Sequence, residues 1–276
     1  MKPIALLELV RPLNCIMAAF GVLIGFVIAA STGQVFVSWQ MLAIAMAVAF
    51  IVCGAGQAIN DVFDSEIDRK LRPKKPIPSE KISRKSALIY SLVLFAIGNC
   101  LALWLPLQSL LISLAFTAIL IIYSAKLQKA KFIGNWVVAL GTAFTLVFGA
   151  SLAGKYGIVL VLAGSALLAN AAREIIKDTQ DMGADRGVKV SLPMLVEMHI
   201  LRLLVLVLYI VAFALAILAG LVLGFGNFFY PMIITIAMLA FLYSAKLFFD
   251  GRLEAAQKYS KIGMLVALIG FFLGAL

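Results

Sequence analysis

Long apolar runs alternate with short polar segments along nearly the whole chain of 276 residues. Each run has roughly 20 residues, the length with which an α-helix crosses the hydrocarbon core of a bilayer. The runs predict nine membrane-spanning helices, at residues 12–30, 40–62, 86–105, 108–125, 133–152, 157–177, 201–223, 229–246 and 259–275. The pattern therefore predicts an all-α integral membrane protein.

The composition agrees with a membrane protein and excludes an ordinary soluble domain. Hydrophobic residues make up 64% of the chain and charged residues 13%, and the mean hydropathy is +1.09. Soluble domains carry about 25% charged residues.

The basic residues predict how the helices are oriented in the membrane. Given nine spans, all of the 23 Lys and Arg residues except Lys155 fall in segments on one side. Because Lys and Arg concentrate in cytoplasmic segments, we expect a cell-membrane protein with its N-terminus in the cytoplasm and its C-terminus outside. The same bias, with attraction to anionic lipid, accounts for the net charge of +10 without a nucleic-acid partner.

Two sequence signatures recur in the same order and predict an internal repeat. DVFDSEID at 61–68 and DTQDMGAD at 178–185 share the pattern D-x-x-D-x-x-x-D, a shift of 117 residues from 61 to 178. YSAKL occurs at 123–127 and again at 243–247, a shift of 120 from 123 to 243. Each copy contains four helices, an even number, so both copies run in the same direction through the membrane. We therefore predict one membrane-embedded domain, 1–276, with two parallel four-helix repeats, about 1–131 and 132–252, and a ninth helix.

The acidic residues of each copy are expected on one helical stripe, at the cytoplasmic ends of the second and sixth predicted helices. At about 100° per residue, positions i, i+3 and i+7 of a helix lie within about 60° of one another. The second stripe requires that the helix continue through Gly183. The six residues are Asp61, Asp64, Asp68, Asp178, Asp181 and Asp185.

Carboxylates gathered in this way repel one another and require cations. A single acidic helix end, solvated and paired with nearby Lys and Arg, needs no ligand, but two copies at matched positions favour a functional site. Oxygen ligands without His or Cys suit a hard cation, above all Mg²⁺, which commonly bridges carboxylates to substrate phosphates. We therefore expect the six Asp residues to bind Mg²⁺ and, through it, a prenyl diphosphate whose tail lies among the helices.

Three segments carry a resemblance to a known family. NDVFDSEIDRKLRP, from Asn60, resembles the N-D-x-x-D-x-x-x-D signature of the UbiA superfamily of intramembrane prenyltransferases. DTQDMGAD is similar to that family's second Asp-rich motif, and RPLN at 11–14 to its R-P-x-N element. The resemblance covers the whole chain and implies nine helices with the motifs after the second and sixth. It also implies Mg²⁺-dependent ionisation of an allylic diphosphate, with the six Asp residues as catalytic residues and metal ligands.

The resemblance and the position of polar residues near the motifs indicate which side chains contact substrate. They are Arg11, Asn14, Asn60, Arg69, Arg72, Tyr123, Lys126 and Lys177. Alternative roles are open for these residues. The basic residues could instead serve only to set the membrane orientation, Asn14 could form a hydrogen bond between helices, and Tyr123 could lie at the membrane interface. Lys126 follows Tyr123 by three residues, whereas family members often have four, so the pattern leaves the contact of Lys126 open.

The acceptor is implied by a narrower resemblance. RPLNC, RPKKPIPSEKIS and AREIIKDTQDMGAD are most similar to archaeal members of the superfamily that form the second ether bond of membrane lipids. This implies geranylgeranyl diphosphate as donor and geranylgeranylglyceryl phosphate as acceptor; prenylation of an aromatic acid or quinone precursor is the alternative. A secondary transporter would place its acids near the bilayer midplane. A CDP-alcohol phosphotransferase would have Gly where Ser65 and Met182 stand.

Overall fold

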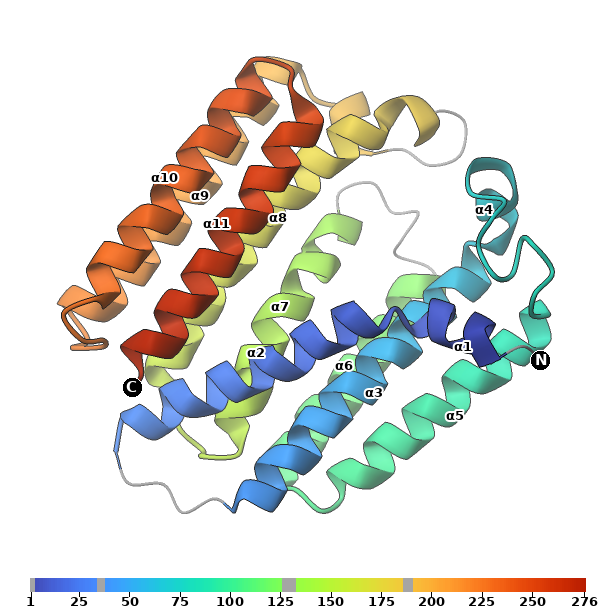
Figure 1. The fold of residues 1–276 in the computed structure, drawn as a ribbon, viewed down its shortest axis with the longest axis horizontal. Coiled ribbons are helices and arrows are strands. Elements are labelled where there is room, and N and C mark those ends of the chain that lie inside the picture. Colours follow the sequence, from blue (N-terminus) through green and yellow to red (C-terminus); the bar gives the residue numbers. More distant parts are fainter. Residues whose placement is uncertain (1–2, 34–37, 126–132, 186–190) are drawn as a thin grey trace. The chain divides into compact units, whose positions relative to one another are not determined.

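The computed structural model describes residues 3–33, 38–125, 133–185 and 191–276 (Figure 1), and within these ranges all regular secondary structure is helical. The α-helices are α1 Pro3–Val10, α2 Pro12–Ser31, α3 Trp39–Phe63, α4 Ser65–Leu71, α5 Arg84–Ala102, α6 Leu107–Ala125, α7 Ile133–Ser151, α8 Gly157–Asp185, α9 Met198–Leu221, α10 Tyr230–Phe249 and α11 Leu253–Gly274. A 3₁₀ turn, η2, covers Leu192–Met194.

The described helices agree with a multi-pass membrane protein. A described helix overlaps most of each of the nine predicted ranges. In the part of the chain that the structure describes, seven helices are long and apolar enough to cross a bilayer: α2, α3, α5, α6, α8, α9 and α10. The described apolar part of α7 is shorter, at Trp136–Ser151, and α11 carries Glu254, Lys258 and Lys261 near its start.

The helices group into two compact units. The first contains the described residues between 1 and 23 and between 36 and 128, and the second those between 24 and 35 and between 129 and 276. The N-terminal part of α2 therefore belongs to the first unit and its C-terminal part to the second.

In the first unit, α3 packs against α5, α6 and α1. Small residues let these helices approach closely, as expected where lipid offers no hydrophobic incentive for helices to associate. At Gly98 in α5, for example, a Cβ atom would lie 2.7 Å from Cγ2 of Val52 in α3.

The segment between α4 and α5 is held on the first unit by a small apolar core. Ile77 and Ile82 of this segment are buried together with Ala5 and Leu9 of α1 and Val62 of α3. Between α4 and α5 the chain runs over these side chains, and this path determines where the basic residues of the segment lie.

In the second unit, α8 packs between α7 and α9, and α10 packs against α11. A buried hydroxyl network joins α9, α10 and α11: Tyr209 donates to Oγ of Ser260 over 2.9 Å, and Ser244 donates to the carbonyl of Ala256 over 2.7 Å. The Tyr209 ring stacks on Phe241, with 4.7 Å between ring centroids. These bonds satisfy polar groups that would otherwise be buried without partners.

Candidate functional site

The first Asp motif lies where α3 meets α4. α3 ends at Phe63 and α4 begins at Ser65, but Asp64 keeps a helical backbone, with φ −80° and ψ −4°. Its N–H donates to the carbonyl of Asn60 over 2.9 Å, and its own carbonyl accepts from the N–H of Asp68 over 2.8 Å. Because the four-residue hydrogen-bond spacing continues across the junction, the motif keeps the stripe that its sequence predicts.

Lys75 joins two carboxylates of this motif. Its Nζ lies 2.9 Å from Oδ1 of Asp61 and 2.6 Å from Oδ2 of Asp68. Both Asp side chains are almost completely buried, with relative exposures of 4% and 5%, and that of Lys75 is 18% exposed. Sequence reasoning did not single out Lys75, although it follows the motif within the basic run RKLRPKKP.

Arg11 also neutralises Asp61. Its Nη2 lies 2.7 Å from Oδ1 of Asp61. Arg11 separates α1 from α2 in a left-handed conformation, with φ +48°, which is unusual for a residue other than Gly. The following Pro12 disfavours the right-handed helical conformation at Arg11, so the chain turns there and directs the guanidinium to α3. Asn14, one turn into α2, is exposed.

Asn60 positions the third carboxylate. Its side-chain Nδ2 donates to Oδ2 of Asp64 over 3.0 Å. Its Oδ1 is buried and accepts no hydrogen bond from the residues that the structure describes. A buried acceptor without a partner is costly, so Oδ1 of Asn60 is suited to contact a ligand.

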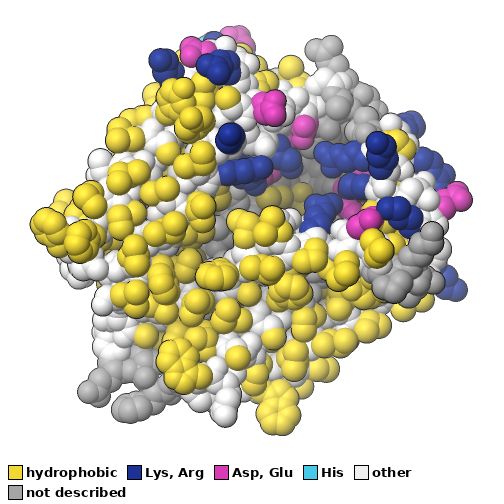
Figure 2. All heavy atoms as spheres, viewed as in Figure 1, with side chains coloured by type: hydrophobic (Ala, Val, Ile, Leu, Met, Phe, Trp, Pro, Cys, Tyr) yellow, Lys and Arg dark blue, Asp and Glu magenta, His cyan; other side chains and the backbone are white. Residues whose placement is uncertain are grey.

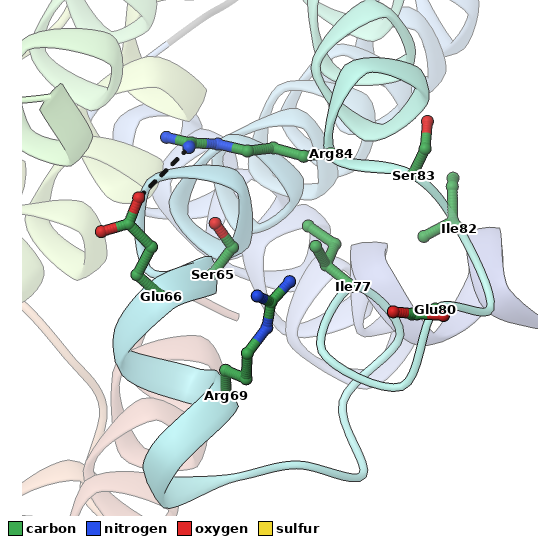
Figure 3. Close-up of a pocket in the computed structure, with 8 residues that line it drawn as sticks. All are labelled: Ser65, Glu66, Arg69, Ile77, Glu80, Ile82, Ser83 and Arg84. Carbon is green, nitrogen blue, oxygen red and sulfur yellow. Dashed lines mark ion pairs between the residues drawn. The ribbon is translucent and has the colours of Figure 1, made fainter.

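Arg69 and Arg72 are exposed on and after α4. Arg69 points into a pocket of about 470 Å³ beside Ser65, and an ion pair of 3.6 Å between Glu66 and Arg84 lies at the same pocket (Figure 3). The full lining is Ser65, Glu66, Arg69, Ile77, Glu80, Ile82, Ser83 and Arg84. Arg69 therefore lies beside polar and apolar side chains of α4 and of residues 77–84.

The second Asp motif lies at the end of α8. The helix continues through Gly183 to Asp185, as the predicted stripe requires. Asp178 is buried and Asp181 half-buried. The side chain of Asp185 lies outside the part that the structure describes.

A buried Glu precedes this motif by one turn and carries its own ion pairs. Glu174 is 3% exposed and pairs with Arg173 and with Lys177, whose Nζ lies 3.7 Å from Oε2. Nε of Arg173 donates to Oδ1 of Asn170 over 3.0 Å, and Nδ2 of Asn170 donates to Thr142 of α7 over 2.9 Å. Asn170 and Arg173 were not predicted as site residues; their polar character inside a predicted span was the available signal.

Of the remaining predicted residues, Tyr123 lies in the last turn of α6. Tyr123 is half-buried, and Lys126 lies outside the described residues. The hydroxyl of the adjacent Ser124 is buried and has no hydrogen-bond partner among the described residues.

In each unit, the charged side chains visible in Figure 2 gather toward one end of the helices, and apolar side chains cover most of the remaining visible face. Among the described residues, no group of three His, Cys, Asp or Glu side chains lies close enough to hold a metal ion by itself. A metal at the first motif would therefore need oxygen donors besides its carboxylates.

Comparison with protein families and known proteins identifies one family of similar proteins. A family model described as the UbiA prenyltransferase family matches residues 18–272. The digeranylgeranylglyceryl phosphate synthase of Pyrococcus abyssi is 37% identical over 280 residues, covering 99% of this chain and 97% of that protein. The protein of the same name from Methanothrix thermoacetophila is 35% identical over 271 residues, covering 98% of each chain.

Solved structures with a similar fold include members of the same family. A structure described as giving insights into digeranylgeranylglyceryl phosphate synthase in membranes superposes with a TM-score of 0.82 at 32% identity, covering 98% of this chain and 97% of that one. A UbiA homolog from Archaeoglobus fulgidus bound to GPP and Mg²⁺ has the same fold, with a TM-score of 0.71 at 16% identity, covering 97% and 99%.

Proposed function

Because the chain belongs to the UbiA prenyltransferase family, we propose that it transfers a geranylgeranyl group from geranylgeranyl diphosphate to geranylgeranylglyceryl phosphate. The observation that carries this proposal is the full-length likeness to digeranylgeranylglyceryl phosphate synthases at 37% and 35% identity. In the reaction, the bond between the prenyl carbon and the diphosphate breaks and a bond from that carbon to the glycerol hydroxyl oxygen forms. The hydroxyl proton and pyrophosphate are released, and the product carries the second ether of an archaeal membrane lipid.

The donor atoms of the Asp motifs fit Mg²⁺ as the cofactor. They are hard oxygens, and the buried Oδ1 of Asn60 adds one more beside the carboxylates of the first motif. The proposed ligands are Asp61, Asp64, Asp68, Asp178, Asp181 and Asp185. When bound, Mg²⁺ neutralises the charge that builds on the departing pyrophosphate. The fold shared with a UbiA homolog bound to GPP and Mg²⁺ supports a divalent metal.

The chain's own residues hold the carboxylates in position and supply positive charge. Arg11 fixes the rotamer of Asp61, and the Asn60 amide holds Asp64. Fixed donors and charges stabilise developing charge without reorganising during the reaction. We assign phosphate or substrate contacts to the other predicted residues: Asn14, Arg69, Arg72, Tyr123, Lys126 and Lys177.

The second motif has its own charge balance. Glu174 pairs with both Arg173 and Lys177, so this pair of bases offsets one buried carboxylate and keeps one positive charge in excess, one turn before Asp178. That excess offsets part of the negative charge of the Asp residues that follow at the end of α8. Arg173 is held by Asn170, which makes it the better fixed of the two bases.

For the membrane arrangement, we propose nine spans in two parallel repeats and a ninth helix, all in one domain of residues 1–276. The N-terminus and both Asp motifs would face the cytoplasm and the C-terminus the outside. The nine helices at the predicted ranges and the distribution of basic residues support this arrangement.

The acceptor is tested by offering each candidate substrate in a separate reaction. Purified protein with Mg²⁺ and geranylgeranyl diphosphate is offered geranylgeranylglyceryl phosphate in one reaction and 4-hydroxybenzoate in another. We expect mass spectrometry to find the doubly prenylated glyceryl phosphate in the first. Product in the second reaction alone would replace the ether-lipid acceptor by an aromatic one and leave prenyl transfer standing.

A further inference from the structure

The ion cluster of the first motif is electrically balanced by the chain itself. Asp61 and Asp68 contribute two negative charges, and Lys75 and Arg11 contribute two positive charges. Both carboxylates are buried, so their charge interacts strongly with any further cation placed beside them. Asp64 adds the third carboxylate of the motif, so a divalent cation bound beside all three would leave one positive charge in excess.

Lys75 contacts one oxygen of each of two carboxylates that are proposed to hold the metal. Its ammonium lies 2.9 Å from Asp61 and 2.6 Å from Asp68 and so bridges the two residues. An ammonium and a Mg²⁺ ion cannot share these oxygens without close repulsion between like charges.

The backbone of Lys75 is fixed while its side chain has room to turn. The N–H and the hydroxyl of Ser79 both donate to the Lys75 carbonyl, over 3.0 Å and 2.6 Å, and Ile77 anchors the same segment in the apolar core. The side chain is partly exposed and has four rotatable carbon–carbon bonds. A lysine ammonium can therefore leave the carboxylates without unfolding the segment.

We infer that Lys75 competes with the divalent cation for Asp61 and Asp68, and that the diphosphate resolves the competition by accepting the Lys75 ammonium. Metal and diphosphate then bind cooperatively: the anion offsets the excess positive charge and draws Lys75 away from the carboxylates. This inference rests on the proposed function, because it takes a metal and a diphosphate as the ligands of this site.

The test measures metal binding and needs no turnover. Mn²⁺, which prefers the same oxygen ligands, is titrated into the purified full-length protein, and bound ion is followed by electron paramagnetic resonance with and without inorganic pyrophosphate. The Mn²⁺–pyrophosphate complex formed without protein is subtracted. In the unaltered protein we expect pyrophosphate to tighten Mn²⁺ binding by about tenfold or more, within the usual range of coupling between sites.

Lys75→Met removes the competing cation. We expect this variant to bind Mn²⁺ without pyrophosphate about tenfold more tightly than the unaltered protein, and to gain less than about threefold from pyrophosphate. Lys74→Met is the matched control, because it removes the same charge from the adjacent, exposed residue. Its binding should match that of the unaltered protein in both conditions.

Two outcomes overturn the inference. One is equal or weaker Mn²⁺ binding by Lys75→Met in the absence of pyrophosphate. The other, which needs no variant, is equally tight Mn²⁺ binding by the unaltered protein with and without pyrophosphate. Asp61→Asn separates this inference from the proposed function. If Asp61→Asn leaves Mn²⁺ binding with pyrophosphate unchanged, the metal site itself is misassigned; if it abolishes binding while Lys75→Met behaves as the unaltered protein, only the role of Lys75 is wrong.

Discussion

Asp64 and Asp181 occupy matched positions in the two motifs, and their surroundings differ. The amide of Asn60 holds Asp64, whereas Asp181 is half-buried on the last turns of α8. If both carboxylates help to hold the Mg²⁺ that would neutralise the leaving pyrophosphate, each should be needed for turnover.

We therefore expect Asp64→Asn and Asp181→Asn each to lower turnover by more than about 100-fold, because a lost carboxylate at a metal costs several kcal/mol of transition-state stabilisation. Release of pyrophosphate from geranylgeranyl diphosphate with acceptor present measures the effect, and gel filtration checks the fold. Asp250→Asn at the exposed end of α10 is the control and should retain activity. Near-normal turnover of either motif variant would contradict the assignment of that motif.

At the scale of elements, close approach of helices governs stability in both units. In the second unit α2 and α7 approach closely, because a Cβ atom on Gly25 would lie 2.0 Å from the backbone oxygen of Leu146. A backbone oxygen cannot rotate aside, so a methyl group there must move one helix.

Gly25→Ala should therefore destabilise the protein by about 1–3 kcal/mol, the usual cost of overpacking. Gly164→Ala in α8 is the matched control, because its Cβ would meet only the flexible Leu215 side chain at an ordinary 3.5 Å and because Ala favours the helix. Thermal unfolding in detergent, followed by tryptophan fluorescence, should show a lower midpoint for Gly25→Ala alone. Equal midpoints for both variants would contradict the close contact.

At the scale of the whole molecule, the membrane topology decides on which side of the bilayer the candidate site lies. If the proposed nine spans and inside N-terminus hold, both Asp motifs face the cytoplasm, where the pyrophosphate product would leave. The bias of basic residues is a property of all the connecting segments together, so it determines orientation more firmly than any single helix does.

Single-cysteine labelling tests this topology in a background that lacks Cys15, Cys53 and Cys100. Thr32→Cys, at the exposed end of α2, should react with a membrane-impermeant maleimide added from outside. Glu254→Cys, at the start of α11, should react only once the cytoplasmic side is opened. Labelling of Thr32→Cys from the cytoplasmic side alone would reverse the orientation, and labelling of both from one side would contradict the odd number of predicted spans between positions 32 and 254.

The sequence by itself determined the positions of the helices and which residues are candidates for the site. A bilayer leaves backbone groups without water partners, so each apolar run must close its hydrogen bonds as a helix, and run length alone predicts the element. The spacing of Asp61, Asp64 and Asp68 predicts their shared stripe for a similar reason, because helical periodicity is local and survives the α3–α4 junction. The continuation of α8 through Gly183 keeps the same local helical periodicity in the second motif.

Only the tertiary structure decided which bases neutralise these acids. Between residues 69 and 85 the sequence contains eight Lys and Arg residues, and positive-inside bias explains all of them equally well. Lys75 reaches Asp61 and Asp68 because Ile77 and Ile82 dock the returning segment on α1 and α3. Arg11 reaches Asp61, 50 residues away, because the chain turns at its positive φ. Both contacts depend on the packing of segments distant in sequence, which no local periodicity encodes.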